Sequence, residues 1–100
     1  MSIPVKNRNE ILATLKLHKF PLQREFPLHR LALFGSWARG DQTETSDVDL
    51  LVEVDPSIGL RFVTLAQRLE ELLGREVDLV SRRGLKPALW TSIEPDLIDV

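Results

Sequence analysis

Residues 33–54 read LFGSWARGDQTETSDVDLLVEV, and this stretch decides the fold. It begins at the end of one apolar run and closes with another apolar run, LLVEV. Between the two runs lie a Gly-Ser pair, Gly35 and Ser36, and two aspartates one residue apart, Asp47 and Asp49. A strand that ends in Gly-Ser and a strand that begins with two acids raise the question of whether the two ends serve one site.

The apolar runs predict strands. Residues 30–34 are short, apolar and followed by glycine, which favours a buried strand over a helix. Residues 48–54 alternate, so one face of this strand is expected to be apolar and the other to carry the acids. Residues 76–80 predict a third strand, with Asp78 on the face opposite its apolar side chains.

The remaining segments predict helices. Apolar residues recur at helical spacing in residues 7–18, where Asn7 or Asn9 can cap the helix and Pro21 is expected to stop it. Residues 36–40 predict one short helical turn, residues 62–73 a long helix ended by glycine, and residues 85–93 a last helix. The sequence therefore predicts a small α/β domain in which helices cover the sheet. The pattern leaves parallel and mixed pairing of the strands open.

Composition and charge limit the function classes. The 100 residues are expected to form one domain, 1–100, because 43% apolar and 28% charged residues are typical of a globular protein with a single core. No apolar run has the length of a membrane span, and the amino end lacks a secretory signal, so we expect a cytoplasmic protein without membrane contact. There is no cysteine and therefore no disulfide. The net charge of −2 predicts no direct binding of nucleic acid.

The paired aspartates predict a metal site. Asp47 and Asp49 are two positions apart on a strand, so they project from one face with Cα atoms about 7 Å apart. No lysine or arginine follows them in the strand, and clustered carboxylates without a partner favour a cation. Mg²⁺ prefers oxygen ligands and binds through one or two carboxylates together with substrate phosphates. Asp78 is a candidate third ligand if its strand pairs beside the second one.

The Gly-Ser pair predicts a phosphate site. A strand that ends at Gly35 and Ser36 and enters a helical turn exposes backbone N–H groups, with no Cβ to block a phosphate. Arg39, one turn further on, could add a charge-assisted contact to the same phosphates. Phosphate contacts beside paired acids indicate metal-nucleotide chemistry.

These residues also match a known pattern. Gly35-Ser36, ten intervening residues and Asp47-Val48-Asp49 resemble the G-S-x(10)-D-x-D signature of the DNA polymerase β-like nucleotidyltransferase superfamily. Residues 33–54, together with EVDLVSRRGLKPAL at residues 76–89, resemble the minimal nucleotidyltransferase (MNT) antitoxins that accompany HEPN toxins. The resemblance covers most of residues 30–93.

The resemblance implies a nucleotidyltransferase fold with a three-stranded mixed sheet flanked by about four helices. It implies that Gly35 and Ser36 hold the triphosphate, and that Asp47, Asp49 and Asp78 bind two Mg²⁺ ions. The implied reaction transfers AMP from ATP to a tyrosine of a HEPN ribonuclease toxin and neutralises it. The toxin would then also be a binding partner and could form an oligomer with the antitoxin.

Alternatives remain open on the sequence alone. The protein could be a non-catalytic antitoxin that acts by occlusion, although all three acids are present. It could be a small-molecule or RNA nucleotidyltransferase, although such enzymes usually carry an added substrate-binding domain. Trp37 could stack on a base but is more often packing. Arg82, Arg83 and Lys86 form a basic cluster of open role, and the apolar residues near the C-terminus could cover the core or a partner.

Overall fold

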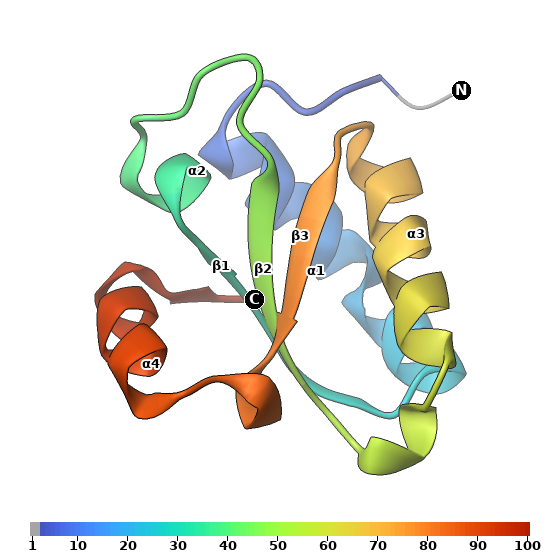
Figure 1. Ribbon diagram of the computed structural model, residues 1–100. Helices are drawn as coiled ribbons and strands as arrows, with labels where there is room; N and C mark the ends of the chain where they lie inside the picture. Colours follow the sequence, from blue (N-terminus) through green and yellow to red (C-terminus); the bar gives the residue numbers. More distant parts are fainter. Residues whose placement is uncertain (1–2) are drawn as a thin grey trace.

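The sheet is built around β2 (Val48–Val54), the strand that follows Asp47. In a computed structural model that describes residues 3–100, β2 pairs antiparallel with β1 (Leu28–Phe34) and parallel with β3 (Val77–Ser81). A short strand, β4 (Ile98–Asp99), pairs antiparallel with the other edge of β1, so the order is β3-β2-β1-β4 (Figure 1). The mixed sheet is confirmed, and it has a fourth strand that the sequence pattern does not predict.

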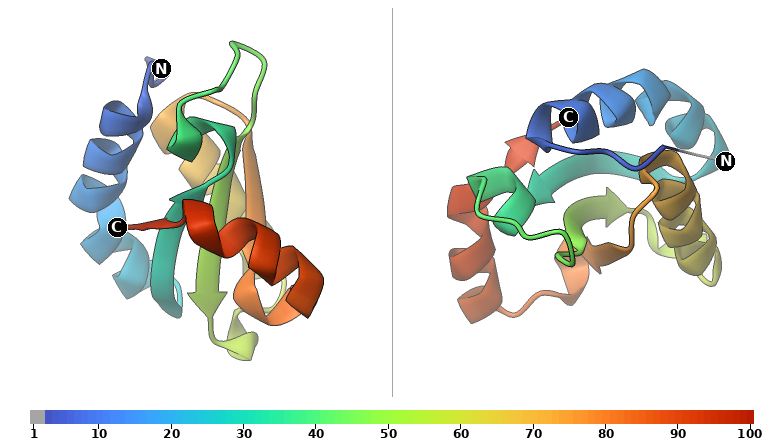
Figure 2. Two further views of the ribbon diagram at one scale, coloured as in Figure 1. Left: turned by 90° about the vertical axis from the view of Figure 1, so that its left-hand side faces the viewer. Right: turned by 90° about the horizontal axis from the view of Figure 1, so that it is seen from above.

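Helices cover both faces of this sheet. Their bounds are α1 (Arg8–Glu25), α2 (Ser36–Arg39), α3 (Arg61–Leu73) and α4 (Pro87–Ile93), with short 3₁₀ segments η1 (Pro56–Ile58), η2 (Arg82–Gly84) and η3 (Glu94–Asp96). Helices α1 and α3 pack on one face, and α4 lies against the opposite face (Figure 2). Among the described residues, none of the helices combines the length and the hydropathy that a membrane crossing requires.

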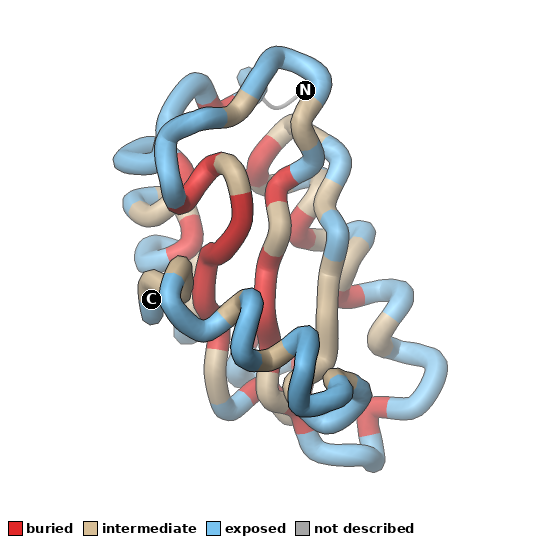
Figure 3. Tube along the Cα trace, turned by 60° about the vertical axis from the view of Figure 1, so that its left-hand side comes forward, coloured by how far each residue is buried: buried red, intermediate tan, exposed pale blue. Residues whose placement is uncertain are grey.

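The main core lies between the sheet and the helices α1 and α3. Each helix contributes three buried side chains at helical spacing, and the two central strands contribute the facing apolar side chains. Buried backbone accordingly runs through the middle of the molecule in Figure 3. The largest completely buried side chains here are Ile11, Leu15, Leu31, Leu33, Val48, Leu50, Val52, Leu65, Leu69 and Leu73, and Leu51 is buried on the other face.

The C-terminal apolar residues pack on the second face of the sheet. They cover Ala32, Phe34 and Leu51 with the side chains of Leu85, Trp90, Ile93 and Leu97. The guanidinium of Arg82 stacks over the ring of Trp90 at 3.9 Å from its centroid. The face of β2 that carries the acids therefore also contributes Leu51 to this second core, and α4 belongs to the fold.

Helix α1 is longer than the sequence pattern predicts. Asn7 caps it as expected, since its side chain accepts from the backbone N–H of Glu10 at 2.9 Å. The helix does not stop before Pro21 but continues to Glu25 with the proline inside it. Pro21 removes a hydrogen bond to the carbonyl of Leu17, and the Leu17 residue is 75% exposed, so water can satisfy this carbonyl.

Other boundaries differ by a few residues. Strand β1 begins at Leu28, two positions before the predicted start, and β3 extends to Ser81. Residues 82–84 form a 3₁₀ turn between β3 and α4. Val63 in α3 is 57% exposed.

Candidate active site

The turn from β1 to α2 depends on Gly35. This residue has φ +76° and ψ −155°, a combination that is essentially restricted to glycine. The carbonyl of Gly35 accepts from the N–H groups of Ala38 and Arg39, each at 3.0 Å, which closes the short helix α2. Glycine is therefore required at position 35 by the backbone itself, and Ser36 is held at the start of α2.

Gly35 also makes room for Asp49. Phe34 pairs with Asp49 across the antiparallel ladder, so the carboxylate of Asp49 lies directly over the glycine. A Cβ at position 35 would stand 3.0 Å from Cγ of Asp49 and closer still to its Oδ2 atom. No real Cβ contact is this tight, so any other residue would displace the carboxylate.

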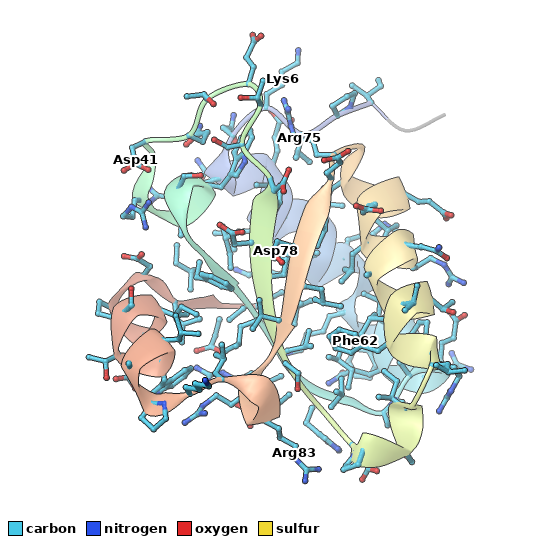
Figure 4. The ribbon with its side chains drawn as sticks, viewed as in Figure 1. Lys6, Asp41, Phe62, Arg75, Asp78 and Arg83 are labelled. Carbon is cyan, nitrogen blue, oxygen red and sulfur yellow. The ribbon has the colours of Figure 1, made fainter. Side chains whose placement is uncertain are left out.

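The third aspartate lies beside the other two. Asp78, which is labelled in Figure 4, is the register partner of Asp49 in the parallel pair β2/β3. Asp47 precedes Asp49 by two positions. Asp49 is half-buried, whereas Asp47 and Asp78 are exposed. The expected placement of β3 next to β2 is thus confirmed.

Electrostatics couple the three acids. The pKa of Asp49 is raised to about 6, mainly by burial and then by the negative charges of Asp78 and Asp47, while Arg39 opposes the shift. The three carboxylates therefore act as one cluster of negative charge in which Arg39 offers only partial compensation. Such a cluster is stabilised by a bound cation.

The donor set fits a divalent metal ion. Three carboxylates supply hard oxygen ligands, and glycine at position 35 leaves room for that of Asp49. Within residues 3–100, no group of three or more histidine, cysteine, aspartate or glutamate side chains is arranged to hold a metal ion by itself. The arrangement resembles a magnesium site that substrate phosphates help to complete, because Mg²⁺ usually binds through one or two carboxylates together with such phosphates.

A cavity of about 260 Å³ lies next to the cluster, and we call it the Gly35 cavity. Its lining from the predicted motif consists of Gly35, Ser36, Arg39 and Asp49, with Phe34 beside them. Three further lining residues, Ser92, Ile93 and Asp96, come from the end of α4 and from η3. The sequence reasoning missed these three, because only the packing of the C-terminal segment brings them to the motif.

Arg39 lines the Gly35 cavity, but its guanidinium already pairs with two carboxylates. Its Nη1 atom donates to Asp96 at 2.7 Å and its Nε atom donates to Asp41 at 3.2 Å. The side chain of Arg39 is 48% exposed, so these ion pairs are weak and can exchange for another anion. A phosphate would have to compete with two carboxylates for this guanidinium.

Trp37 packs into the core. It is 2% exposed, and its Nε1–H donates to the carbonyl of Ser46 at 3.1 Å. The hypothesis that this ring stacks on a nucleotide base is therefore wrong, and the packing interpretation holds. The hydrogen bond also ties α2 to the loop that leads into β2.

A larger cavity of about 400 Å³ contains none of the three aspartates. It is lined by Lys6, Trp37, Gln42, Thr43, Glu44 and Arg75, and we call it the Arg75 cavity. Size alone would favour it as the active site. The chemistry favours the Gly35 cavity, because only there do a glycine turn, a hydroxyl and a carboxylate with a raised pKa meet.

A glycine turn for phosphates beside clustered carboxylates defines a class of proteins that transfer phosphorus-containing groups from nucleotides. The sequence profile of the nucleotidyltransferase domain matches residues 15–99, so this chain belongs to the nucleotidyltransferase family and its substrate is a nucleotide. The resemblance noted in the sequence is confirmed at the level of the family.

One relative and two solved structures are similar to this chain over most of its length. The protein adenylyltransferase MntA of Thermococcus cleftensis is 39% identical over 93 residues, which cover 91% of this chain and 93% of MntA. A solved structure described as a minimal nucleotidyltransferase superposes with a TM-score of 0.78 at 35% identity, covering 95% of this chain and 97% of the other. A crystal structure of a toxin-antitoxin with AMP-PNP matches with a TM-score of 0.67 at 29% identity, covering 94% of this chain and 72% of the other.

Proposed function

We propose that this protein is a Mg²⁺-dependent protein adenylyltransferase that transfers AMP from ATP to a tyrosine of a HEPN-type ribonuclease toxin and thereby neutralises it. The observation that carries the proposal is the cluster of Asp47, Asp49 and Asp78 beside the Gly35-Ser36 turn. Two comparisons support it: one relative is a protein adenylyltransferase, and one structural neighbour is a toxin-antitoxin with AMP-PNP, an analogue of ATP.

The residues of the Gly35 cavity bind the donor nucleotide. Gly35 and Ser36 hold the triphosphate through the turn and the hydroxyl, and Arg39 exchanges its carboxylate partners for a phosphate oxygen. Asp47, Asp49 and Asp78 would hold two Mg²⁺ ions, which when bound neutralise the phosphates and stabilise the attacking and departing oxygens. The adjoining apolar side chains of Phe34 and Ile93 limit water in the cavity.

The reaction is a displacement at the α-phosphorus of ATP. The tyrosine oxygen forms a bond to the α-phosphorus, the bond to the bridging oxygen breaks, and pyrophosphate leaves while the hydroxyl proton is lost to solvent. This chain contributes position and charge and needs no histidine for proton transfer. Since its substrates would be ATP and a cytoplasmic ribonuclease, the proposal places the protein in the cytoplasm.

Labelled ATP tests the proposal. The protein is incubated with Mg²⁺, labelled ATP and a purified HEPN toxin from the same genome, and we expect label on the toxin and loss of its ribonuclease activity. The double variant Asp47→Asn/Asp49→Asn should transfer at least about 1000-fold more slowly, because it removes two carboxylates that bind the metal. The matched control is Asp55→Asn, since Asp55 only caps η1 and asparagine caps equally well.

The competing function is inhibition by occlusion. If the double variant, or the wild type without ATP, inhibits the toxin as strongly as the complete reaction does, the protein acts by binding alone. If the wild type labels small-molecule acceptors but no toxin, the small-molecule alternative replaces the proposal.

A further inference from the structure

The Arg75 cavity is assembled from three separate segments. Lys6 comes from the segment before α1, Gln42, Thr43 and Glu44 come from the loop before β2, and Arg75 comes from the turn between α3 and β3. Figure 4 shows Lys6 and Arg75 together at the end of the molecule where β2 and β3 begin, beyond Asp78. This cavity has no part in nucleotide binding as described above.

Arg75 is fixed in this cavity by neutral groups. Its Nε atom donates to the carbonyl of Val5 at 2.6 Å and its Nη1 atom donates to the carbonyl of Glu44 at 3.4 Å. The guanidinium also lies over the ring of Trp37 at 4.8 Å from the centroid. These contacts orient the guanidinium but leave its positive charge without a counter-ion.

The ammonium group of Lys6 also has no counter-ion among the described residues. Among the ion pairs within residues 3–100, which involve Arg30, Arg39 and Arg68, none includes Lys6 or Arg75. Only the backbone N–H of Lys6 is engaged, by Glu10, and not its ammonium group. Two cations without carboxylate partners thus line one cavity, which is a site for an anion.

Gln42 supplies an independent sign of a ligand. Its Oε1 atom is buried and has no hydrogen-bond partner in the described residues, and Gln42 lines the same cavity. A buried acceptor without a donor is costly unless a ligand supplies one. A peptide supplies both groups that this cavity lacks, a backbone N–H for Gln42 and a carboxylate for the cations.

The cavity opens toward the catalytic cluster. An adjoining cavity of about 340 Å³ shares Glu44 and Arg75 with it and is also lined by Asp47 and Glu76, so this second cavity is mainly acidic. The Gly35 cavity, with Ser36 and Asp49, contains neither Arg75 nor Asp47. The attacking oxygen approaches the α-phosphorus opposite the leaving pyrophosphate. With the triphosphate in the Gly35 cavity, an acceptor therefore approaches from the Asp47 side.

We propose that the Arg75 cavity binds the protein acceptor and selects acidic residues next to its tyrosine. This rests on the proposed function, of which it names the acceptor chemistry. Arg75 and Lys6 pair with a carboxylate of the acceptor, and Gln42 accepts from its backbone. Inorganic phosphate is the competing ligand of the two cations, and the test below distinguishes it from a peptide carboxylate.

Peptide binding tests the inference without turnover. Fluorescent pentapeptides with a central tyrosine, flanked by glutamates, glutamines or lysines, are titrated with the full chain and followed by fluorescence anisotropy. We expect the glutamate peptide to bind the wild type at least about fivefold more tightly than the glutamine peptide. Lys6→Glu should abolish this preference, and the matched control Lys16→Glu, with the same charge change on the exposed surface of α1, should keep it.

The outcomes separate the inference from the proposed function. An acidic preference that depends on Lys6, combined with no AMP transfer to the toxin, would support the acceptor site and contradict adenylyl transfer. Equal binding of the three peptides, no binding, or equal effects of Lys6→Glu and Lys16→Glu would overturn the inference. Displacement of the glutamate peptide by equimolar inorganic phosphate would also overturn it, because the cavity would then be a phosphate site.

Discussion

The Gly35 cavity and the Arg75 cavity both adjoin α2, yet their arginines are held in opposite ways. Arg39 in the first donates to two carboxylates, Asp41 and Asp96, whereas Arg75 in the second donates only to carbonyls and lies over Trp37. The first cavity also contains Asp49, whose pKa is raised to about 6. One cavity has surplus negative charge and the other surplus positive charge.

This difference indicates that the two cavities bind different ligands beside one catalytic cluster. Surplus carboxylates attract metal ions and the triphosphate that accompanies them, whereas surplus cations attract an acidic partner. Asp47 and Asp49 are consecutive side chains on one face of the chain entering β2, and they face different cavities. The predictions below test whether the two cavities bind different ligands.

Among the single substitutions at the Gly35 cavity, the largest effect is expected for Gly35→Ala. A Cβ at this position collides with the carboxylate of Asp49, and the backbone conformation disfavours any residue but glycine. We expect AMP transfer to fall at least about 100-fold, because small displacements of reacting groups have effects of this size. Initial rates of AMP transfer and the Tm of both variants check this. Gly84→Ala is the control, since a Cβ there meets nothing within 4 Å.

The charge of Asp49 predicts a pH-dependent stability. Its pKa is raised from 3.8 to about 6, so the native state without metal binds a proton more readily than the unfolded state, and stability falls as pH rises through this range. Asp49→Asn should therefore raise the free energy of unfolding by about 1 kcal/mol near pH 8, after allowance for solvent screening, and have little effect near pH 4. Urea unfolding in EDTA at the two pH values measures this.

The contribution of Asp55 to the free energy of unfolding is expected to depend on pH in the opposite direction, and the same urea unfolding experiment measures it. Hydrogen bonds from Ser57 lower the pKa of its carboxyl group, so its contribution is present at neutral pH and is lost as pH falls. Asp55→Asn should not stabilise the protein near pH 8. A gain in stability for both variants would mean that general charge reduction, and not the acid cluster, explains the result.

A smaller effect is expected for Asp96→Asn. Asp96 competes with the triphosphate for Arg39 and adds negative charge to the Gly35 cavity. We expect the KM for ATP to fall about threefold with little change in kcat, in line with the strength of an exposed ion pair. Arg39→Ala should raise the same KM. If both variants leave the KM unchanged and only lower the Tm, Arg39 is a structural link to the C-terminal segment.

The central part of the fold could be predicted from the sequence because its signals are local. The alternation in β2, the glycine that ends β1 and the glycine after α3 each act within a few residues. The spacing of Asp47 and Asp49 fixes their common face in the same way. Strand β4 has only two residues and leaves no readable period, whereas the last helix was predicted although α4 has no buried residue.

The parts of the site that the sequence alone did not fix depend on long-range packing. The position of Asp78 beside Asp49 needs the parallel pairing of β2 and β3, which the sequence allowed but did not require. Asp96 reaches Arg39 only because the C-terminal residues cover Phe34 and Leu51. The contact of Arg75 with Val5 joins residues 70 positions apart. Contacts of this kind leave no local pattern in the chain.

The most direct test of the central claim, that acids from β2 and β3 form one catalytic cluster, is single-turnover AMP transfer to the toxin by Asp78→Asn. The account predicts a rate at least about 100-fold below that of the wild type, with AMP-PNP affinity within about threefold, because the Gly35 cavity stays intact. Transfer within about threefold of the wild-type rate would contradict the account.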